Sequence, residues 1–392
     1  MNIRRAIGFA LPGIVLILVV LGLHAFIQRQ LKTASPAAAT PTPTESPATP
    51  SAAATQAPTL SATPQPTASP AATIRPADTA TPRPTSTPAP PPTATPTPGP
   101  IVTNDKLGVG IYTSGIPLNV LRTLRPAMIL IQDPDPRSVP QLRSVFPKAL
   151  IVGRHYVPDG DFTLARCSDA KEDHRAKGVA FADMLARSAV PLKGIVDAWV
   201  SDNEQTSSRV PAQLGCHADF QTGFIETLQG TYGIAAVAGN DASGALEPSD
   251  YPKYFAKPIS EAVYFGVHAY GKPETLTLQS PDAIFYALRY RLIHDELVKA
   301  GVPLPKGGFL LTESGYYQGW RGYVPDQKMA DDFTWLEQQT EQDSYVKGQF
   351  VFGIGPRGRF YNYEIMGTTL LDLLGQFNAQ HAGTPEGVPA RA

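Results

Sequence analysis

Aromatic residues are missing from a long stretch near the start of this 392-residue chain, because none occurs between Phe26 and Tyr112. Within this stretch, residues 33–100 are almost wholly Ala, Pro, Thr and Ser and contain 19 of the 40 prolines. Such a composition cannot bury enough apolar surface to offset the entropy of ordering the chain, which excludes a folded domain there. We therefore predict a disordered linker over residues 33–100, with a preference for the polyproline II conformation.

Excess charge of either sign and the spacings typical of metal sites are also missing. The formal net charge is -1 and no basic stripe occurs, so nothing indicates a nucleic-acid partner. His155, His217 and His268 could suggest a metal hydrolase, but no HxH or HExxH spacing exists. We therefore predict neither a nucleic-acid partner nor a metal site.

Cysteine is scarce. Only Cys167 and Cys216 occur, and both are expected in loops on one side of the folded part. Outside the cytoplasm a disulfide between them is reasonable, and two free buried thiols are the alternative.

An apolar segment precedes the linker. Residues Ala6 to Phe26 are uncharged and long enough to cross a bilayer as a helix of about 20 residues. Arg4 and Arg5 precede this segment, as basic residues also do in a cleaved signal peptide. The apolar run is long for a signal peptide and no clean small-x-small site follows closely, so we predict an uncleaved membrane anchor over residues 1–32, with secretion after cleavage as the alternative. The Pro/Thr-rich spacer favours an extracytoplasmic location for the domain that follows.

Residues 101–380 suit one (β/α)8 barrel, an α/β fold that typically needs about 250 residues, followed by a disordered tail over residues 381–392. Apolar runs recur at regular intervals with helical stretches between them, as expected for repeated β–α units. Several runs, such as Met128 to Ile131, are unbroken, which is typical of strands covered on both faces. The predicted strands are Lys106–Tyr112, Ala127–Gln132, Ala149–His155, Ile195–Asn203, Ile234–Gly239, Ala262–His268, Gly308–Glu313 and Gly348–Ile354.

The stretches between the strands carry helix signals. Ser280-Pro281-Asp282 offers an N-cap residue type, a proline at the first helical position and an early acid. Ile284 then begins an apolar repeat with four-residue spacing that Gly301 ends, which predicts a helix over this segment. Similar patterns predict helices over residues 170–187 and 330–342. An open, doubly wound sheet is the alternative fold, but no Gly-rich phosphate loop follows the first predicted strand.

Polar and ionisable side chains gather directly after the apolar runs. In a barrel enzyme the reacting groups lie where the strands end, on one face. Burying so many polar groups would cost free energy unless they had hydrogen-bond partners or a function, so as a set they predict a polar cleft. These residues are Tyr112, Gln132, Asp133, Arg154, His155, Asn203, Glu204, Asn240, Asp241, His268, Tyr270 and Glu313.

Glu204 and Glu313 end the fourth and the seventh predicted strand. These strands lie across the barrel mouth from each other, so the two side chains can face each other over a bound sugar. Cleavage of a glycosidic bond with retention needs two carboxyl groups about 5–5.5 Å apart, one ionised to attack and one protonated to donate a proton. The pair therefore indicates glycoside hydrolysis, a reaction for which we expect neither a metal nor an organic cofactor. Either residue alone has a simpler explanation, since Asn203-Glu204 could cap a helix and Glu313 could pair with an arginine on the rim.

The order of these motifs resembles that of the retaining glycoside hydrolases of clan A, which are (β/α)8 enzymes. That family has Asn-Glu at the end of strand four, an aromatic residue or histidine near the end of strand six, and a second glutamate at the end of strand seven. The matching motifs here are Asn203-Glu204, His268-Ala-Tyr270-Gly and Thr312-Glu313-Ser-Gly, within a resemblance that covers roughly residues 106–374.

The resemblance implies a role for each matched residue. Glu204 would be the acid/base and Glu313 the nucleophile, while Asn203 would bind the sugar 2-hydroxyl. Tyr270 or His268 would orient Glu313. The substrate-binding residues implied or expected at the strand ends are Asn203, Arg154, His155, Asn240, His268 and Tyr270.

One departure from the family pattern concerns stacking. Clan members usually have a tryptophan platform at the end of strand eight, whereas residues 352–361 of this chain contain none. We expect Trp320, or else Tyr361, to supply the stacking surface instead. Trp199 is expected to pack in the core.

The leading hypothesis is a membrane-tethered, extracytoplasmic retaining glycosidase that acts on an oligo- or polysaccharide, with a β-linked substrate favoured. A barrel that binds cell-surface glycans without cleaving them is the alternative, motivated by the missing tryptophan. A third hypothesis is a structural envelope protein that uses the barrel as a spacer-borne head.

Overall fold

The computed structural model describes residues 99–156, 173–205 and 211–383. The predicted membrane anchor, Cys167, nearly all of the predicted linker and most of the predicted tail lie outside these residues. Among the described helices, none has both the length and the hydropathy that a membrane span requires.

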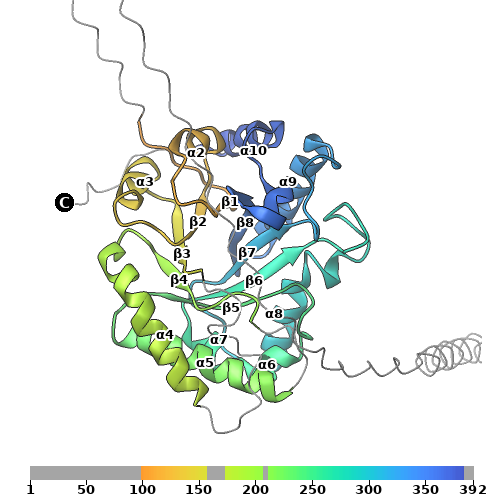
Figure 1. Cartoon of the computed structure of the whole chain (residues 1–392). Helices are drawn as coiled ribbons and strands as arrows, with labels where there is room; N and C mark the ends of the chain where they lie inside the picture. Colours follow the sequence, from red (N-terminus) through yellow and green to blue (C-terminus); the bar gives the residue numbers. More distant parts are fainter. Residues whose placement is uncertain (1–98, 157–172, 206–210, 384–392) are drawn as a thin grey trace, which may run out of the picture. The chain divides into compact units, whose positions relative to one another are not determined.

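Eight parallel strands close into a barrel in which each strand pairs with its neighbour in sequence and β8 pairs with β1. Figure 1 shows the strands in the centre of the molecule. Their bounds are β1 Leu107–Ile111, β2 Met128–Gln132, β3 Leu150–Arg154, β4 Ala198–Val200, β5 Ala236–Asp241, β6 Tyr264–Tyr270, β7 Phe309–Gly315 and β8 Val346–Ile354. This confirms the predicted (β/α)8 barrel and all eight predicted strands, although β4 is much shorter than expected.

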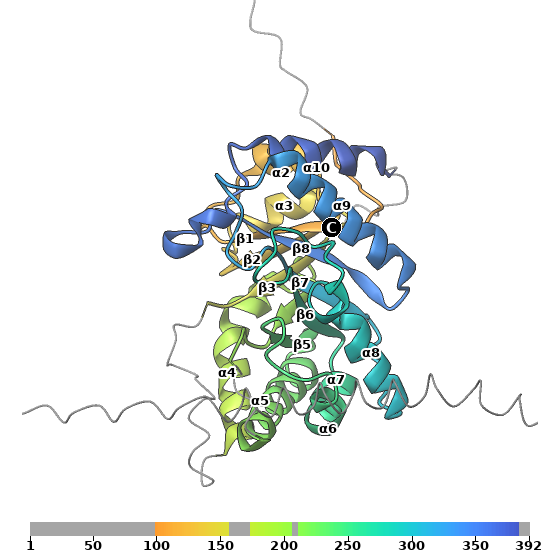
Figure 2. The ribbon, with the colours of Figure 1, turned by 90° about the vertical axis from the view of Figure 1, so that its right-hand side faces the viewer.

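Helices surround the strands (Figures 1 and 2). They are α2 Leu118–Leu124, α3 Val139–Val145, α4 His174–Ala189, α5 Pro211–Gly230, α6 Asp250–Tyr254, α7 Ala256–Glu261, α8 Arg289–Lys299, α9 Asp326–Gln342 and α10 Thr369–Gln380. Short 3-10 turns lie at Val190–Leu192, Ala283–Phe285 and Gly358–Tyr363. The predicted helices near residues 170–187 and 330–342 correspond to α4 and α9. Cys216 lies on α5 rather than in a loop and is disulfide-bonded.

The helix predicted to begin at Pro281 begins only at Arg289. Asp282, expected to support the first turn, pairs instead with Lys272 at 2.7 Å. The backbone of Leu278 and the side chain of Gln279 are held by the buried Asp332 of α9, through hydrogen bonds of 2.9 Å each. Contacts to neighbouring elements therefore hold this segment outside the helix, which begins later in the sequence than predicted.

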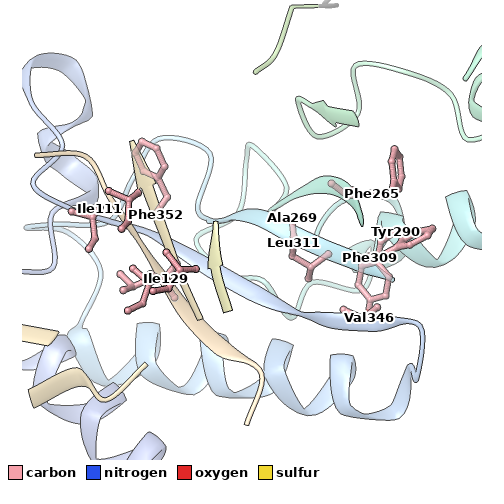
Figure 3. Packing of buried hydrophobic residues seen from close by; sticks show 14 of the residues in the cluster. Ile111, Ile129, Phe265, Ala269, Tyr290, Phe309, Leu311, Val346 and Phe352 are labelled. Atoms are coloured by element: carbon pink, nitrogen blue, oxygen red, sulfur yellow. The ribbon is translucent and has the colours of Figure 1, made fainter. Parts of the chain in front are cut away.

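The barrel interior and its outer face carry two separate apolar layers, because successive side chains of a strand point to opposite sides. The interior layer consists of Ala127, Met128, Leu130, Val152, Ala198, Val200, Val237, Leu310 and Phe350. The outer layer packs the strands against the helices, and Figure 3 shows part of it, including Phe309, Tyr290 and Val346. Both layers are close to fully buried, so the lower part of the barrel is a packed core rather than a pore.

Trp199 belongs to the outer layer and is 1% exposed, so it packs in the core as expected. Its ring covers Gly153 of β3, where a Cβ atom would lie only 2.7 Å from the indole. Only glycine allows the indole of β4 to approach the backbone of β3 this closely.

Candidate active site

A cavity of about 870 Å³ opens at the carboxyl ends of the strands. Side chains two positions apart on a strand point to the same side. Gln132, Arg154 and Phe352 each follow an interior-layer residue by two positions, so they also point into the barrel and line the cavity. The polar mouth of the barrel therefore begins directly above its apolar filling.

Glu313 reaches the cavity through an irregularity in β7. The pairing of β6 with β7 shifts register between Val267 and His268, so that Val267 pairs with Leu311 and His268 pairs with Glu313. An inserted residue of this kind re-aims the following side chain. Without the shift, strict alternation from Leu310 would point Thr312 inward, whereas Glu313 is the residue that lines the cavity.

The two predicted carboxyl groups lie close together. Oxygens of Glu204 and Glu313 and a ring nitrogen of His268 are all within 4.8 Å of one another. Glu313 is 4% exposed on β7, whereas the side chain of Glu204, which follows β4, is 44% exposed. The separation suits two carboxyl groups that act on the same sugar carbon.

Both oxygens of Glu313 are held. Its Oε1 accepts a hydrogen bond from Nη1 of Arg154 at 2.5 Å, and its Oε2 accepts one from the hydroxyl of Tyr270 at 2.8 Å. Burial raises the pKa of Tyr270 and the negative charge of Glu313 raises it further, so the phenol stays protonated and remains a donor. The carboxylate therefore has a fixed orientation and a buried counter-charge.

Arg154 joins the residues of several strands. Its Nη1 also donates to Oδ1 of Asn203 at 2.8 Å, and its Nη2 donates to Oε1 of Gln132 at 3.2 Å. The guanidinium lies over the ring of Tyr112, 5.2 Å from the centroid. Burial alone lowers the pKa of Arg154, but the neighbouring acidic groups outweigh burial and raise it, so the group remains a cation at any ordinary pH.

Glu204 is held differently. Its Oε1 lies 2.9 Å from Nδ1 of His268, and its backbone N–H donates to the carbonyl of Asn240 at 3.0 Å. Burial alone lowers the pKa of His268, but the charge of Glu313 and the interaction with Glu204 outweigh burial and raise it, which favours an imidazolium that donates to Glu204. Glu204 also has a left-handed backbone with φ of 50°, a conformation that costs a non-glycine residue roughly 1–2 kcal/mol.

Glu204, His268 and Glu313 have the residue types of a metal site. However, Arg154 and Tyr270 already engage both oxygens of Glu313. A cation placed among the three side chains would have to compete with the buried guanidinium for the same carboxylate.

The structure brings most of the predicted site residues together. Glu204, Glu313, Asn203, Arg154, His155 and Tyr270 line the cavity. His155 pairs with Asp133 at 2.7 Å. His268 and Asn240 are buried beside the cavity rather than in its wall, and they contact Glu204 through the ring and the main-chain carbonyl respectively.

The expectation that Trp320 forms a stacking surface is wrong. Trp320 is 0% exposed and packs against Phe333 and Tyr363, so no face of its ring is open to a sugar. Tyr361 is exposed but lies against the guanidinium of Arg321 and is not part of the cavity wall.

The aromatic wall of the cavity is formed by other residues, which are Tyr112, Tyr156, Phe181, Phe220, Tyr317, Phe352, Phe360 and Tyr363. Phe352 packs on Tyr112 with ring centroids 4.2 Å apart, and the ring of Phe360 meets that of Phe352 edge-on with centroids 5.9 Å apart. The period-two pattern of β8 could have found Phe352, since it follows Phe350 by two positions. No periodic signal marks Tyr317 or Phe360, because both lie in segments beyond the strand ends.

Comparison with known proteins returns solved structures only, since no protein-family model and no curated protein matches the chain. A GH5 xyloglucan-specific endo-beta-1,4-glucanase from a metagenomic library is 12% identical with a TM-score of 0.46, over 70% of this chain and 97% of that one. A glycoside hydrolase family 5 enzyme from Prevotella bryantii is 11% identical with a TM-score of 0.46, over 71% and 99% of the two chains. A Cellulomonas fimi endo-beta-1,4-mannanase is 14% identical with a TM-score of 0.47, over 70% of each chain. These similar structures are glycoside hydrolases, and the barrel of the present chain is assigned from its own strand pairing.

Proposed function

We propose that this protein is a retaining glycoside hydrolase that cleaves an oligo- or polysaccharide. The family resemblance favours a substrate whose scissile bond is β-linked. The observation that supports the proposal best is the approach of two carboxyl oxygens to within 4.8 Å at the mouth of the barrel, in unlike surroundings. One carboxylate is buried and ion-paired, and the other is partly open to solvent.

The surroundings suggest the roles. Glu313 is the nucleophile, because Arg154 and the hydroxyl of Tyr270 each bond one of its oxygens and so hold the carboxyl group in one orientation at the cavity. Glu204 is the acid/base, because it reaches solvent, from which its proton can be exchanged between the two steps.

The reaction would proceed by two displacements at the same sugar carbon. Glu204 donates its proton to the glycosidic oxygen while an oxygen of Glu313 attacks the anomeric carbon, the bond to the leaving group breaks, and a glycosyl ester forms. Glu204, now a carboxylate, then removes a proton from a water molecule that attacks the same carbon, and Glu313 leaves as a carboxylate. Both groups return to their starting protonation states, and the product keeps the configuration of the substrate.

The predicted anchor and linker complete the proposal. A helix over residues 6–26 would hold the protein in a membrane, and the Pro/Thr-rich segment would carry the barrel away from it, on the extracytoplasmic side. A protease-protection assay on membrane vesicles of defined orientation tests this part. Degradation of the barrel domain only in vesicles with the extracytoplasmic face outward is the expected result.

Covalent labelling tests the enzymatic part. A panel of activated 2-fluoro-glycosides should inactivate the protein and leave a sugar on the peptide that contains Glu313. A screen of chromogenic β-glycosides and β-glucans identifies the sugar. Binding to glycans without label or product on the whole panel would favour the alternative, a barrel that binds glycans without cleaving them.

Azide distinguishes the two roles. With an activated substrate, a Glu313→Gly variant should form a glycosyl azide of inverted configuration, because azide replaces the missing nucleophile in a single displacement. A Glu204→Ala variant should form an azide of retained configuration, because azide attacks the glycosyl ester in place of water. Exchange of the two product configurations between the variants would reverse the assignment.

A further inference from the structure

A buried polar cluster lies beside the strand end that carries Glu204, and the proposed reaction does not use it. It consists of Asp202, which directly precedes Asn203-Glu204, Asp241 at the end of β5, and His217 and Gln221 on α5. His217 and Gln221 are 0% exposed, and the side chain of Asp202 is 6% exposed.

The contacts converge on the carboxylate of Asp202. Its Oδ2 lies 2.7 Å from Nε2 of His217, and its Oδ1 accepts hydrogen bonds from the side chain of Gln221 at 3.0 Å and from the hydroxyl of Ser201 at 2.6 Å. Asp202 is therefore fixed in position relative to α5.

The same two helix residues also contact β5. His217 and Gln221 are four residues apart, so they share one face of α5. Gln221 accepts a hydrogen bond from the N–H of Gly239 and donates one to the carbonyl of Gly239, both at 3.0 Å. Nδ1 of His217 lies 3.7 Å from Oδ1 of Asp241. One face of α5 thus links the ends of β4 and β5.

The cluster holds a charge. Burial alone lowers the pKa of His217, but the charges of Asp202 and Asp241 and the hydrogen bond to Asp202 outweigh burial and raise it, which favours the imidazolium. A buried ion pair adds little stability compared with apolar packing, because both charges lose their hydration. The outer barrel layer around α5 is otherwise apolar, with Leu214, Phe220 and Phe224 all buried. Stability is therefore a weak explanation for a charged group at this place.

The position of Glu204 offers a better explanation for the buried charge. β4 contains only three residues, Ala198–Val200, so the sheet pairing ends before Asp202. Glu204 has a left-handed backbone and a side chain that is 44% exposed, so neither a relaxed backbone nor close packing holds it. On one side its backbone N–H is held by Asn240, and on the other side Asp202 is held by α5.

We propose that His217 is a positioning residue for the acid/base: through Asp202 it fixes the segment 202–204 so that the carboxyl group of Glu204 reaches the leaving-group oxygen. The proposal rests on the proposed function. His217 does not line the cavity and acts only through Asp202.

The leaving group of the substrate provides the test. A dinitrophenolate departs without a proton, whereas a phenolate or a sugar alkoxide needs the proton of Glu204. In full-length His217→Ala, kcat/KM for a phenyl glycoside of the sugar found in the screen should fall by about 10²-fold or more, the range of general acid catalysis. For the dinitrophenyl glycoside it should fall by less than about 3-fold. Azide should raise kcat on the dinitrophenyl glycoside, because the base step is also impaired.

Three further variants separate the possible outcomes. His217→Gln can still donate a hydrogen bond to Asp202 and should recover most of the loss on the phenyl glycoside. Asp332→Asn disturbs a buried, hydrogen-bonded carboxylate that, unlike Asp202, does not line the cavity, and it should affect both substrates equally. Glu204→Gln should show the full dependence on the leaving group, and its failure to do so would reject the proposed function rather than the role of His217.

The rate of labelling by the dinitrophenyl 2-fluoro-glycoside reports whether the site is folded, since that step needs no acid. Unchanged labelling with a selective loss on the phenyl glycoside would support the positioning role. An equal loss on both substrates, with or without slower labelling, would overturn it and leave His217 a purely structural residue.

Discussion

Buried carboxyl groups occur at both ends of the barrel, but they differ in the partners that their oxygens have. At the mouth, Glu313 is almost covered, but a guanidinium and a phenol meet its two oxygens. Before β1, at the opposite end, Asp105 accepts a backbone hydrogen bond from Leu107 at 3.1 Å, and its nearest ion-pair partner, His381, is 3.8 Å away. Burial raises the pKa of Asp105 to about 7, with a further contribution from Glu337.

The comparison shows that burial alone does not prepare a carboxylate for attack. Arg154 and Tyr270 fix the two oxygens of Glu313 at the cavity, whereas Oδ2 of Asp105 has no hydrogen-bond partner among the described residues and burial raises the pKa of that carboxyl. Three substitutions test this difference and a fourth, Phe360→Ala, tests the aromatic wall at the same mouth; the largest expected effect comes first.

Glu313→Gln should reduce kcat/KM by about 10⁴-fold or more on every substrate, regardless of the leaving group, because the group that forms the covalent intermediate is lost. The measurement is steady-state kinetics with a dinitrophenyl and a phenyl glycoside. A residual activity above one hundredth of the original rate would contradict the assignment of the nucleophile.

Arg154→Met should reduce kcat by about 10²-fold and lower the free energy of unfolding by about 3–5 kcal/mol, because the buried carboxylate loses its counter-charge. The measurements are kinetics and urea unfolding. Arg143→Met is the matched control, since Arg143 pairs with Asp197 at 2.5 Å outside the cavity. The control should leave kcat unchanged, and equal losses of kcat in both variants would refute a specific role for Arg154.

Phe360→Ala should raise KM by about 3- to 10-fold with little change in kcat, because one aromatic contact with a sugar contributes about 1 kcal/mol. Tyr361→Ala is the control, because the neighbouring ring is similarly exposed but lies outside the cavity wall. If the control raised KM as much as Phe360→Ala, the aromatic wall would be assigned to the wrong residue.

Asp105→Asn should stabilise the protein by about 1–2 kcal/mol at pH 8 and have little effect at pH 4. The unfolded carboxyl loses its proton near pH 3.8 and the folded one near pH 7, so between these values the folded state holds a proton that the unfolded state releases. The stability of the original protein therefore falls as the pH rises through this window, and asparagine removes the dependence.

Urea unfolding at both pH values measures the effect of Asp105→Asn. The control is Asp135→Asn, because hydrogen bonds from Arg137 lower the pKa of the exposed Asp135 carboxyl instead of raising it. A gain in stability of Asp105→Asn at pH 4 that equals the gain at pH 8 would refute the titration argument.

The repeated β–α units of the barrel could be predicted from the sequence. Parallel strands covered on both faces need continuous apolar runs, and these runs located all eight strands to within a few residues. Because reactive side chains follow the strand ends, Arg154, Glu204 and Glu313 could be expected on the same face before their distances were known.

Features that depend on contacts between elements distant in sequence could not be predicted. The register shift that points Glu313 into the cavity depends on how β6 pairs with β7, and pairing leaves no local signature in the chain. The burial of Trp320 results from contacts with Phe333 and Tyr363, which come from two other elements. The link from His217 to Asp202 joins a helix to a strand end, and only the folded arrangement shows that the two side chains meet.

The two-residue offset between the apolar filling and the cavity wall has a consequence for redesign. Gln132 and Phe352 each stand one inward step above Leu130 and Phe350, but Gln132 accepts a hydrogen bond from Arg154 and Phe352 is buried against Tyr112. A library at the exposed rim residues Tyr317 and Phe360 would therefore search for altered sugar selectivity with less loss of folded protein than one at positions 132 and 352.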